Sequence, residues 1–503
     1  MGSDTDFLLG YDHLSPSVLR DAVDRRPTLS LSDRVLDRLK SAHHVVRQAS
    51  LQRLPVYGLT TGVGAQARAP VEQAERAVAI FNRRLVLDHA GGIGPDLPEP
   101  VCYAVALVRL HNLALGGSGI GPAVLAHAVA LLNAGVVPVI PQAGSVGASD
   151  LSACAALASA WCLGEGRVYH DKRSRPAADV LHELGLGEVD LLGKDGLSLL
   201  SANSLSLGYG ALLSDLLLGV LDVHLQGVAL SFEAYGANLS VLAPEIHRLR
   251  PYSRQGEMAA RLRALLKDSY LWEELAARNL QDPLSFRCTP QVLGALYERI
   301  ERLWQFLDAD LNALSDNPVI LIEKAEIVPT GNFDTTSLSL DVDAVSQGIV
   351  RAILMCERRI DKLLSTSFSS LPAGLSNHPT AHGYTILSHT SASLAAEALS
   401  VSLGGIPQIA PIEEGVEDVG SMAPVALARL QRLTDMMLTM TAIETLVASR
   451  AGRLLARRPI AGIRLIQRVE ECIQGQNTPG SQAYAVRETL LQALPRDFLV
   501  SVV

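Results

Sequence analysis

Residues 141–163 read PQAGSVGASDLSACAALASAWCL, a glycine-punctuated loop that runs directly into a helix of small and apolar residues. Gly144 and Gly147 allow the backbone to turn sharply or to lie close to another segment. From the residues alone, Ser149 is expected to cap the helix, with Asp150 at the positive end of the helix dipole. The rest of the chain is expected to be arranged around this loop.

The hexapeptide GSVGAS at 144–149 and the GEG at 164–166 resemble the signature of the histidine and aromatic amino acid ammonia-lyases. In that family an Ala-Ser-Gly triad cyclises into methylidene-imidazolone (MIO), an electrophile that no ordinary side chain supplies. The resemblance implies a self-formed MIO from Ala148, Ser149 and Asp150, and no external cofactor. Asp150 departs from the family's glycine, either as a substitution or as the trace of a deletion. A side chain there makes the tight backbone of ring closure harder to reach.

The composition excludes several classes of partner. Hydrophobic residues make up 48% of the 503 residues and aromatic residues only 4%, so the interior is built from Leu, Val and Ala, which suits close-packed helices. A net charge of −9 argues against nucleic acid and anionic membranes as partners. The uncharged stretches 112–140 and 196–214 are long enough to suggest a membrane. Glycine, serine, asparagine or proline interrupts both, so buried helices are expected instead.

The cysteines and the N-terminus indicate a cytoplasmic protein. The six cysteines form no CxxC pair and lie mostly in apolar sequence, which is typical of reduced core residues. The acidic start, MGSDTD, has no apolar run, so no secretory signal is expected. The sequence also contains no metal-ligand spacing and no phosphate-binding loop.

The periodicity predicts a mainly α protein. Ser32 and Asp33 begin a helix, and residues 292–314 repeat leucine or isoleucine at three- and four-residue spacing. Residues 196–217 resemble a single helix of that family, and 319–322 with 326–329 read as a small hairpin.

The resemblance implies the ammonia-lyase architecture. We expect residues 1–195 to form a smaller, loop-rich head with the lid and the MIO-like loop. Residues 196–503 are expected to form a central long-helix bundle followed by the C-terminal helices. The family is homotetrameric, and each of its active sites draws on three subunits. A homotetramer with shared sites is therefore expected here, which also explains helices too apolar for a monomer.

Two segments of the expected head resemble ammonia-lyase segments whose residues face the substrate. The segment VYGLTTGVG at 56–64 is similar to the family's active-site lid, which implies that Tyr57 acts as catalytic acid or base. His89 ends the segment FNRRLVLDH. It corresponds to the family position that determines substrate preference, where a histidine implies a substrate with a polar ring. From the residues alone, the segment 56–64 could equally be a mobile loop, and His89 could be a structural or solvated histidine.

The segment QDPLSFRCTPQ at 281–291 is close to a family motif whose arginine holds the substrate carboxylate through a two-pronged contact. The resemblance assigns that role to Arg287. Leu284 replaces the motif's tyrosine and removes a hydroxyl from beside the reacting amine. The plainer alternative is a loop whose arginine pairs with a neighbouring acid.

Three further positions border the expected site. Ser201 occupies the place of an asparagine that steadies the prosthetic group, and Asn203 lies two residues later, where a helix would point it elsewhere. Phe333 belongs to a GNF segment that borders the family's active site. Glu417, in IEEGVEDVGSMA at 412–423, stands where histidine-specific members carry a glutamate that holds an imidazole or takes a β-proton. Without the resemblance, the acidic residues of the segment 412–423 would be interpreted as solvated surface charges.

These assignments leave three hypotheses open. In the first, the ring matures and the protein is an ammonia-lyase or aminomutase for a histidine-like or aromatic amino acid. In the second, no ring forms and the enzyme eliminates trimethylamine from a betaine, as ergothionase does. In the third, the chain is a catalytically silent subunit of a mixed tetramer. The two enzymatic hypotheses both predict cleavage of a carbon–nitrogen bond.

Overall fold

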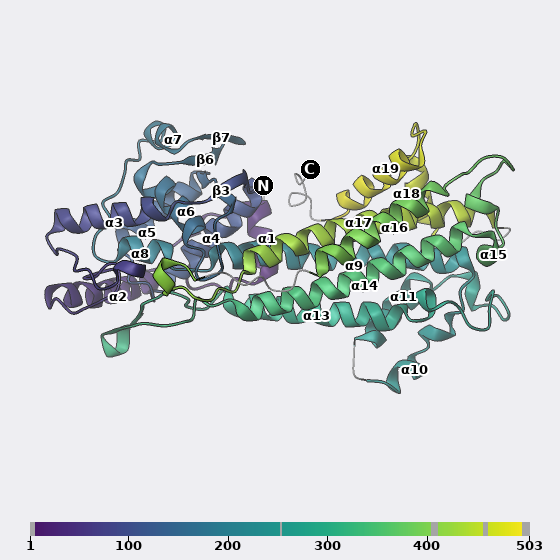
Figure 1. Cartoon of the computed structure of the whole chain (residues 1–503), viewed down its shortest axis with the longest axis horizontal. Coiled ribbons are helices and arrows are strands. Elements are labelled where there is room, and N and C mark those ends of the chain that lie inside the picture. The colour runs from purple at the N-terminus through teal and green to yellow at the C-terminus, as the bar shows by residue number, and fades with distance from the viewer. Residues whose placement is uncertain (1–5, 252–253, 404–410, 456–460, 495–503) are drawn as a thin grey trace.

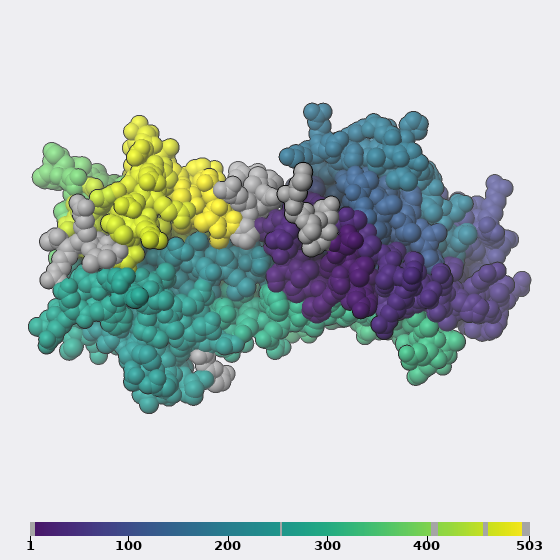
Figure 2. All heavy atoms as spheres, turned by 180° about the vertical axis from the view of Figure 1, so that it is seen from behind, coloured from purple at the N-terminus to yellow at the C-terminus, as the bar shows by residue number. Residues whose placement is uncertain are grey.

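The computed structural model describes residues 6–251, 254–403, 411–455 and 461–494, and shows an elongated molecule with two lobes (Figure 1). Figure 2 shows the same two lobes from behind, with purple and blue N-terminal residues in one and teal and yellow residues in the other. The first lobe, the head, contains α1 (Pro16–Arg25), α2 (Asp33–Leu51), α3 (Glu75–His89), α4 (Glu99–Ala114), α5 (Pro122–Asn133), α6 (Leu151–Leu163), α7 (Ala177–Glu183) and α8 (Asp195–Leu200).

The second lobe is a bundle of long helices. Its helices are α9 (Ser204–Tyr235), α10 (Pro244–Arg248), α11 (Gln255–Leu265), α12 (Leu284–Arg287), α13 (Thr289–Asp310), α14 (Thr336–Leu364), α15 (Thr366–Ser369), α16 (Ile386–Ser402), α17 (Ala423–Leu454), α18 (Ile463–Cys472) and α19 (Pro479–Gln492). Short 3-10 turns are η1 (Gly64–Gln66), η2 (Leu239–Leu242), η3 (Tyr270–Trp272), η4 (Ile322–Lys324), η5 (Ala373–Leu375) and η6 (Glu413–Gly415).

The strands are short and lie mostly in the head. Strands β1 and β2 pair in parallel, while β3–β5, β4–β6–β7 and β8–β9 are antiparallel. Their bounds are β1 (Phe7–Leu8), β2 (Leu29–Ser30), β3 (Ile93–Asp96), β4 (Val137–Pro138), β5 (Pro141–Ala143), β6 (Arg167–His170), β7 (Arg173–Pro176), β8 (Val319–Leu321) and β9 (Glu326–Val328). The predicted hairpin is therefore confirmed.

The apolar face predicted for residues 292–314 is buried, as its spacing required. Leu293, Leu296, Ile300, Leu303 and Leu307 are each at most 2% exposed along α13. Because such residues recur every three or four positions, they lie on one side of the helix and pack against α9 and α14. Ser32 also caps α2 as predicted, with its side chain accepting a hydrogen bond from Val35 N.

The single helix predicted for residues 196–217 is wrong, because the chain breaks between α8 and α9. The Ser201 hydroxyl accepts a hydrogen bond from Asn317 N at 3.0 Å, and the Ala202 carbonyl accepts one from Asp150 N at 2.7 Å. The Ala202 carbonyl thus bonds a distant segment instead of the next helical turn, and Ser201 has non-helical backbone angles. Ser201 and Asn203 therefore lie at a junction of two helices rather than on one helical surface.

The apolar segment Asp195–Tyr235, which includes α8 and α9, is long and apolar enough to cross a membrane by length and composition. Within the described residues, 83% of its most apolar window is buried, as in the core helix of a globular protein. The six cysteines are all free; four are buried and two half-buried. Both observations agree with the expected packing of a helical core.

Parts of the second half of the chain return to the head. The β8–β9 hairpin packs against α2 (Figure 1). The segment 412–417 lies beside the lid, where Ala65 N donates to the Glu413 carboxylate at 3.4 Å. A cavity formed in the head therefore receives side chains from residues more than 300 positions apart in the sequence.

Candidate active site

A cavity of about 890 Å³ opens in the head, between the lid, α3, the 144–152 loop and the segment 412–417. It brings together Tyr57, His89, Ala148, Ser149 and Glu417, all of which the sequence assigned to the site. Carboxylates outnumber cations along its walls, since Glu72, Asp88, Glu413 and Glu417 face one guanidinium, Arg84. This surplus of negative charge favours a ligand that carries a cation.

Tyr57 lies on the lid with its hydroxyl fixed by the main chain. Gly64 N donates to the Tyr57 hydroxyl oxygen at 2.7 Å, which leaves the phenol's own hydrogen for another acceptor. Burial raises the pKa of Tyr57, Gly64 opposes the shift, and the charges of Glu417 and Glu413 add to it. Tyr57 is therefore a phenol at neutral pH and donates a hydrogen bond.

His89 is held at the last turn of α3 in one tautomer. Its Nδ1 lies 2.7 Å from the Leu85 carbonyl oxygen, which accepts but cannot donate, so Nδ1 carries the hydrogen. In the neutral imidazole, Nε2 is then an acceptor. Because His89 lines the cavity, this acceptor is available to a ligand.

Glu417 is a half-buried carboxyl group beside two other ionisable side chains. Burial raises its pKa, Glu413 raises it further, and the nearby His89 opposes the shift. A carboxylate with a raised pKa is a stronger base than an exposed one. Glu417 is thus suited to accept a proton inside the cavity.

The GSVGAS loop is held against two segments from the second half of the chain. Met422 N donates to the Val146 carbonyl at 2.9 Å, and the Ser421 hydroxyl donates to the Gly147 carbonyl at 3.0 Å. Gly147 has a φ of +77°, and a Cβ atom there would overlap the Ser421 hydroxyl. Ala148 forms an antiparallel bridge with Asp334. Glycine is required at 147 because both the backbone angle and the space exclude a side chain.

Asp150 does not act as expected. The N-cap of α6 is Asp150 and not Ser149, which has a left-handed φ of +57°, and the Asp150 side chain makes no capping bond to α6. Its carboxylate instead accepts from Ser206 N at 2.7 Å and the Ser145 hydroxyl at 2.6 Å. Burial raises the pKa of Asp150, and the bonds from Ser145 and Ser206 oppose the shift. Asp150 thus places a carboxylate at the N-terminus of α9, where the helix dipole favours it.

Residues 14–472 match the family model for aromatic amino acid lyases. The chain belongs to the aromatic amino acid lyase family. The histidine ammonia-lyase of Myxococcus xanthus (strain DK1622) is 34% identical over 447 residues, covering 88% of this chain and 87% of the relative. That of Stigmatella aurantiaca is 35% identical over 427 residues, covering 84% and 83%. The chain is accordingly a carbon–nitrogen lyase that carries out an ammonia-lyase-like elimination.

Solved structures agree on the mainly helical ammonia-lyase fold. Histidine ammonia-lyase from Trypanosoma cruzi has a TM-score of 0.86 at 28% identity, covering 97% of this chain and 93% of that one. Ergothionase from Treponema denticola, in complex with desmethyl-ergothioneine sulfonic acid, has a TM-score of 0.92 at 24% identity, covering 99% and 100%. The second likeness is one of fold alone.

The residues at 148–150 do not fit the family's MIO group. Ring closure uses the nitrogen of the third residue, but Asp150 N donates to the Ala202 carbonyl at 2.7 Å. A ring nitrogen carries no hydrogen, so closure would leave the buried Ala202 carbonyl without this partner. The Asp150 side chain is itself enclosed, with 0% exposure, among Ser145 and Ser206. The loop is therefore arranged around a carboxylate rather than around an electrophile.

Three other predicted residues lie near the loop without lining the cavity. Ser201 binds Asn317 N, and Asn203 is fully buried with neither amide atom bonded to any described residue. Phe333 is half-buried directly before Asp334, the bridge partner of Ala148.

Arg287 and Leu284 are far from the cavity of their own chain. Thr335 lies at the loop, where its hydroxyl meets that of Ser421, and α14 runs from there to Arg359, which contacts α12. Twenty-four residues of helix span roughly 35 Å. Arg287 therefore cannot reach the cavity of its own chain.

The sequence did not point to Glu413, Glu72, Asp88 or Arg84, all of which line the cavity. Glu413 and Glu417 are four apart, but the local chain is a turn in which Ile412 and Glu417 pair. Asp88 directly precedes His89, and that adjacency was the available signal. The other two were indistinguishable from solvated surface charges.

Proposed function

We propose that the protein eliminates a neutral amine from the trimethylammonium betaine of a histidine-like amino acid, such as ergothioneine, without MIO. The observation that carries this is Asp150. Its nitrogen donates to the Ala202 carbonyl in a bond that ring closure would break, and its carboxylate is held by Ser145 and Ser206. A primary amine needs an electrophile to become a good leaving group, whereas a trimethylammonium already departs as neutral trimethylamine. The acidic cavity wall supports a substrate with a permanent positive charge.

In the proposed reaction, the Glu417 carboxylate takes the proton from the substrate's β-carbon. The electron pair of that C–H bond forms the Cα=Cβ double bond, and the electron pair of the C–N bond leaves with trimethylamine. The products are an α,β-unsaturated acid, trimethylamine and a protonated Glu417. The raised pKa of Glu417 suits a base that works near neutral pH.

The substrate ring is proposed to be an imidazole or a close analogue. A neutral imidazole has one N–H donor and one nitrogen acceptor. In the cavity, His89 Nε2 supplies the matching acceptor and the Tyr57 phenol the matching donor. A phenyl ring would leave both groups unpaired, at a cost of about 1–3 kcal/mol for each buried polar group.

The site is proposed to be completed by a second subunit in a cytoplasmic homotetramer. Arg287 supplies the guanidinium for the substrate carboxylate, and Leu284 beside it provides an apolar surface where the family motif has a hydroxyl. Leu284 is 61% exposed in the single chain, which agrees with a surface that another subunit covers. A head formed by residues 1–195 and a bundle formed by 196–503 are proposed as the two folding units.

The decisive experiment is the mass of the peptide covering residues 144–163 from the native protein. We expect the unmodified mass, because the Asp150 nitrogen is held by Ala202. Trimethylamine release from ergothioneine should then exceed ammonia release from histidine, tyrosine and phenylalanine. Loss of two waters would contradict the proposal and favour the second candidate, MIO-dependent elimination or amine migration on a free amino acid, which the similarity to histidine ammonia-lyases supports. An inactive protein that binds neither substrate would favour the silent-subunit hypothesis.

The pH dependence of kcat/KM should reveal the effect of the Glu413 charge on the pKa of Glu417. Only the ionised carboxylate accepts a proton, so kcat/KM should fall as the pH drops through the raised pKa of Glu417. Because the Glu413 charge contributes to that rise, Glu413→Gln should move the acidic limb to lower pH. The matched control is Glu414→Gln, which removes the neighbouring charge but does not line the cavity. Equal shifts in both variants would contradict the assignment of this limb to Glu417.

A further inference from the structure

The segment that carries Arg287 is a single helical turn and needs outside support. Helix α12 has only four residues, and an isolated helical turn of this length is not stable by itself. Leu284 is 61% exposed, whereas Phe286 is only 1% exposed. The Phe286 ring stacks on Tyr235 at 4.3 Å between centroids and meets Phe232 at 5.6 Å. One side of the turn is therefore anchored on α9 and the other carries the candidate substrate contact.

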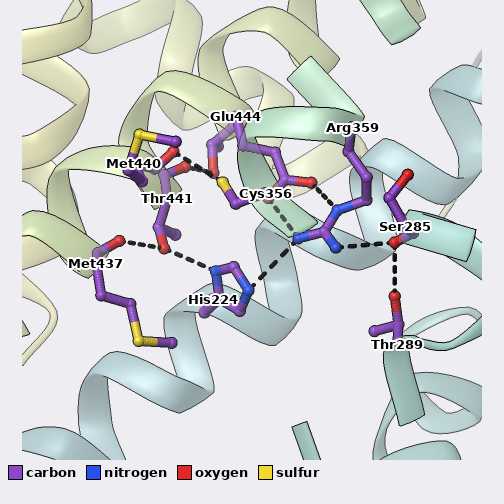
Figure 3. Close-up of polar contacts among 10 residues, drawn as sticks. His224, Ser285, Thr289, Cys356, Arg359, Met437, Met440, Thr441 and Glu444 are labelled. Atoms are coloured by element: carbon purple, nitrogen blue, oxygen red, sulfur yellow. Dashed lines mark hydrogen bonds and ion pairs between the residues drawn. The ribbon is translucent and has the colours of Figure 1, made fainter. Parts of the chain in front are cut away.

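A buried ion pair supports the main chain of this turn (Figure 3). Arg359 on α14 donates from Nε and Nη2 to the two carboxylate oxygens of Glu444 on α17, at 2.5 and 2.9 Å. Its Nη1 donates to the Ser285 carbonyl at 3.0 Å, and the Thr289 hydroxyl donates to the same oxygen at 3.0 Å. Since the two-pronged pair fixes the plane of the guanidinium, the third nitrogen is held in place for α12.

His224 on α9 closes the network from the opposite side (Figure 3). Its Nδ1 lies 2.8 Å from the Thr441 hydroxyl, which donates to the Met437 carbonyl, so Nδ1 must be the donor. Nε2 is then the acceptor for Arg359 Nη2 at 3.5 Å. Burial lowers the pKa of His224 to about 4, with Arg359 adding to the effect and Glu444 opposing it. The imidazole is thus neutral across the physiological range and orients the guanidinium without adding charge.

Stability alone does not account for this arrangement. Arg359 and Glu444 are 1% and 0% exposed, and replacing a buried ion pair with apolar residues is often neutral or stabilising. The pair instead fixes the relative positions of four helices, because the three guanidinium nitrogens of Arg359 on α14 bond to residues of α17, α9 and α12. Arg287, two residues beyond Ser285, donates to Gln281 at 3.1 Å and forms no ion pair within the described residues. Its guanidinium is therefore placed without being neutralised.

We propose that Arg359 and Glu444 are positioning residues for substrate binding, which fix α12 so that Arg287 presents its guanidinium to the carboxylate in the active site of another subunit. The inference rests on the proposed role of Arg287. The two residues do not line the cavity of this chain, and they act through the Ser285 main chain.

The test is Arg359→Lys in the full-length oligomer. Lysine keeps the charge near Glu444 but cannot hold the carboxylate with two prongs and reach Ser285 as well. We expect KM for the betaine to rise roughly ten- to hundredfold, with a much smaller change in kcat, because a misplaced Arg287 weakens carboxylate binding. The matched control is Arg429→Lys, which alters an ion pair with Asp343 that joins the same two helices, α14 and α17, away from α12.

Two readouts separate this inference from the proposed function. Inhibition constants are measured for an imidazole compound that carries a carboxylate and for the corresponding amine that lacks it. They show whether the loss of affinity in Arg359→Lys depends on the carboxylate. Hydrogen exchange in residues 281–291 shows whether α12 has loosened. Unchanged exchange in Arg359→Lys, or equal weakening of both inhibitors, would overturn the positioning role while leaving Arg287 assigned. If the wild-type enzyme ignores the carboxylate, and Arg287→Ala has no effect, the assignment of Arg287 falls and the inference falls with it.

Discussion

Arg287→Ala is expected to raise KM for a carboxylate-bearing substrate by roughly 10²- to 10³-fold, with a much smaller effect on kcat. Removing one member of a desolvated charge pair costs about 3–5 kcal/mol, because the other charge is left without its partner. The loss falls on binding because the carboxylate is remote from the bonds that break. Steady-state kinetics with the betaine and with a decarboxylated analogue would measure it.

The matched control for this variant is Leu284→Ala, which truncates a side chain on the same helical turn without removing a charge. It should change KM by less than about thirtyfold, since about 2 kcal/mol or less of apolar contact is lost. Arg287→Lys should recover only part of the affinity, because an ammonium cannot make the two-pronged contact. Unchanged affinity in Arg287→Ala would remove Arg287 from the site.

Tyr57→Phe is expected to lower kcat by roughly 10²- to 10³-fold, the usual loss when one donor to a developing charge is removed. As the β-proton leaves, electrons accumulate on the carbon beside the ring and spread to the ring nitrogen, where the phenol donates. The raised pKa of Tyr57 keeps that hydrogen in place up to alkaline pH. Single-turnover kinetics on the betaine would isolate this step.

A suitable control is Tyr11→Phe, which removes a phenol that is 60% exposed and lies outside the cavity. It should leave kcat unchanged. If Tyr57→Phe also keeps its kcat, the phenol is not a transition-state donor. Refolding Tyr57→Phe together with Arg287→Ala should restore part of the activity, because mixed oligomers form some sites that have both residues intact. No recovery would contradict a shared site, since the two residues lie in different lobes of one chain.

The candidate site was only partly predictable from its residues. Tyr57, His89 and Glu417 were assigned from three separate segments, and all three line one cavity. Arg287 was assigned from a fourth segment, yet it lies near the far end of α14, roughly 35 Å from the loop. A motif shows which chemistry a residue supports, but not where the fold places that residue, because its place depends on how helices pack over long distances.

The sequence by itself determined the family, the helical bundle and the hairpin, because glycine loops and the apolar spacing of residues such as those in α13 act locally. Only the tertiary structure decided the role of Asp150. Its side-chain partners, Ser145 and Ser206, lie on either side of it in the chain, and Ser206 is 56 residues away. The tertiary structure also interrupts the helix predicted across Ser201, because hydrogen bonds from Asn317 and Asp150 outweigh helix propensity there. Local preferences amount to less than about 1 kcal/mol per residue, so a few buried hydrogen bonds from distant segments override them.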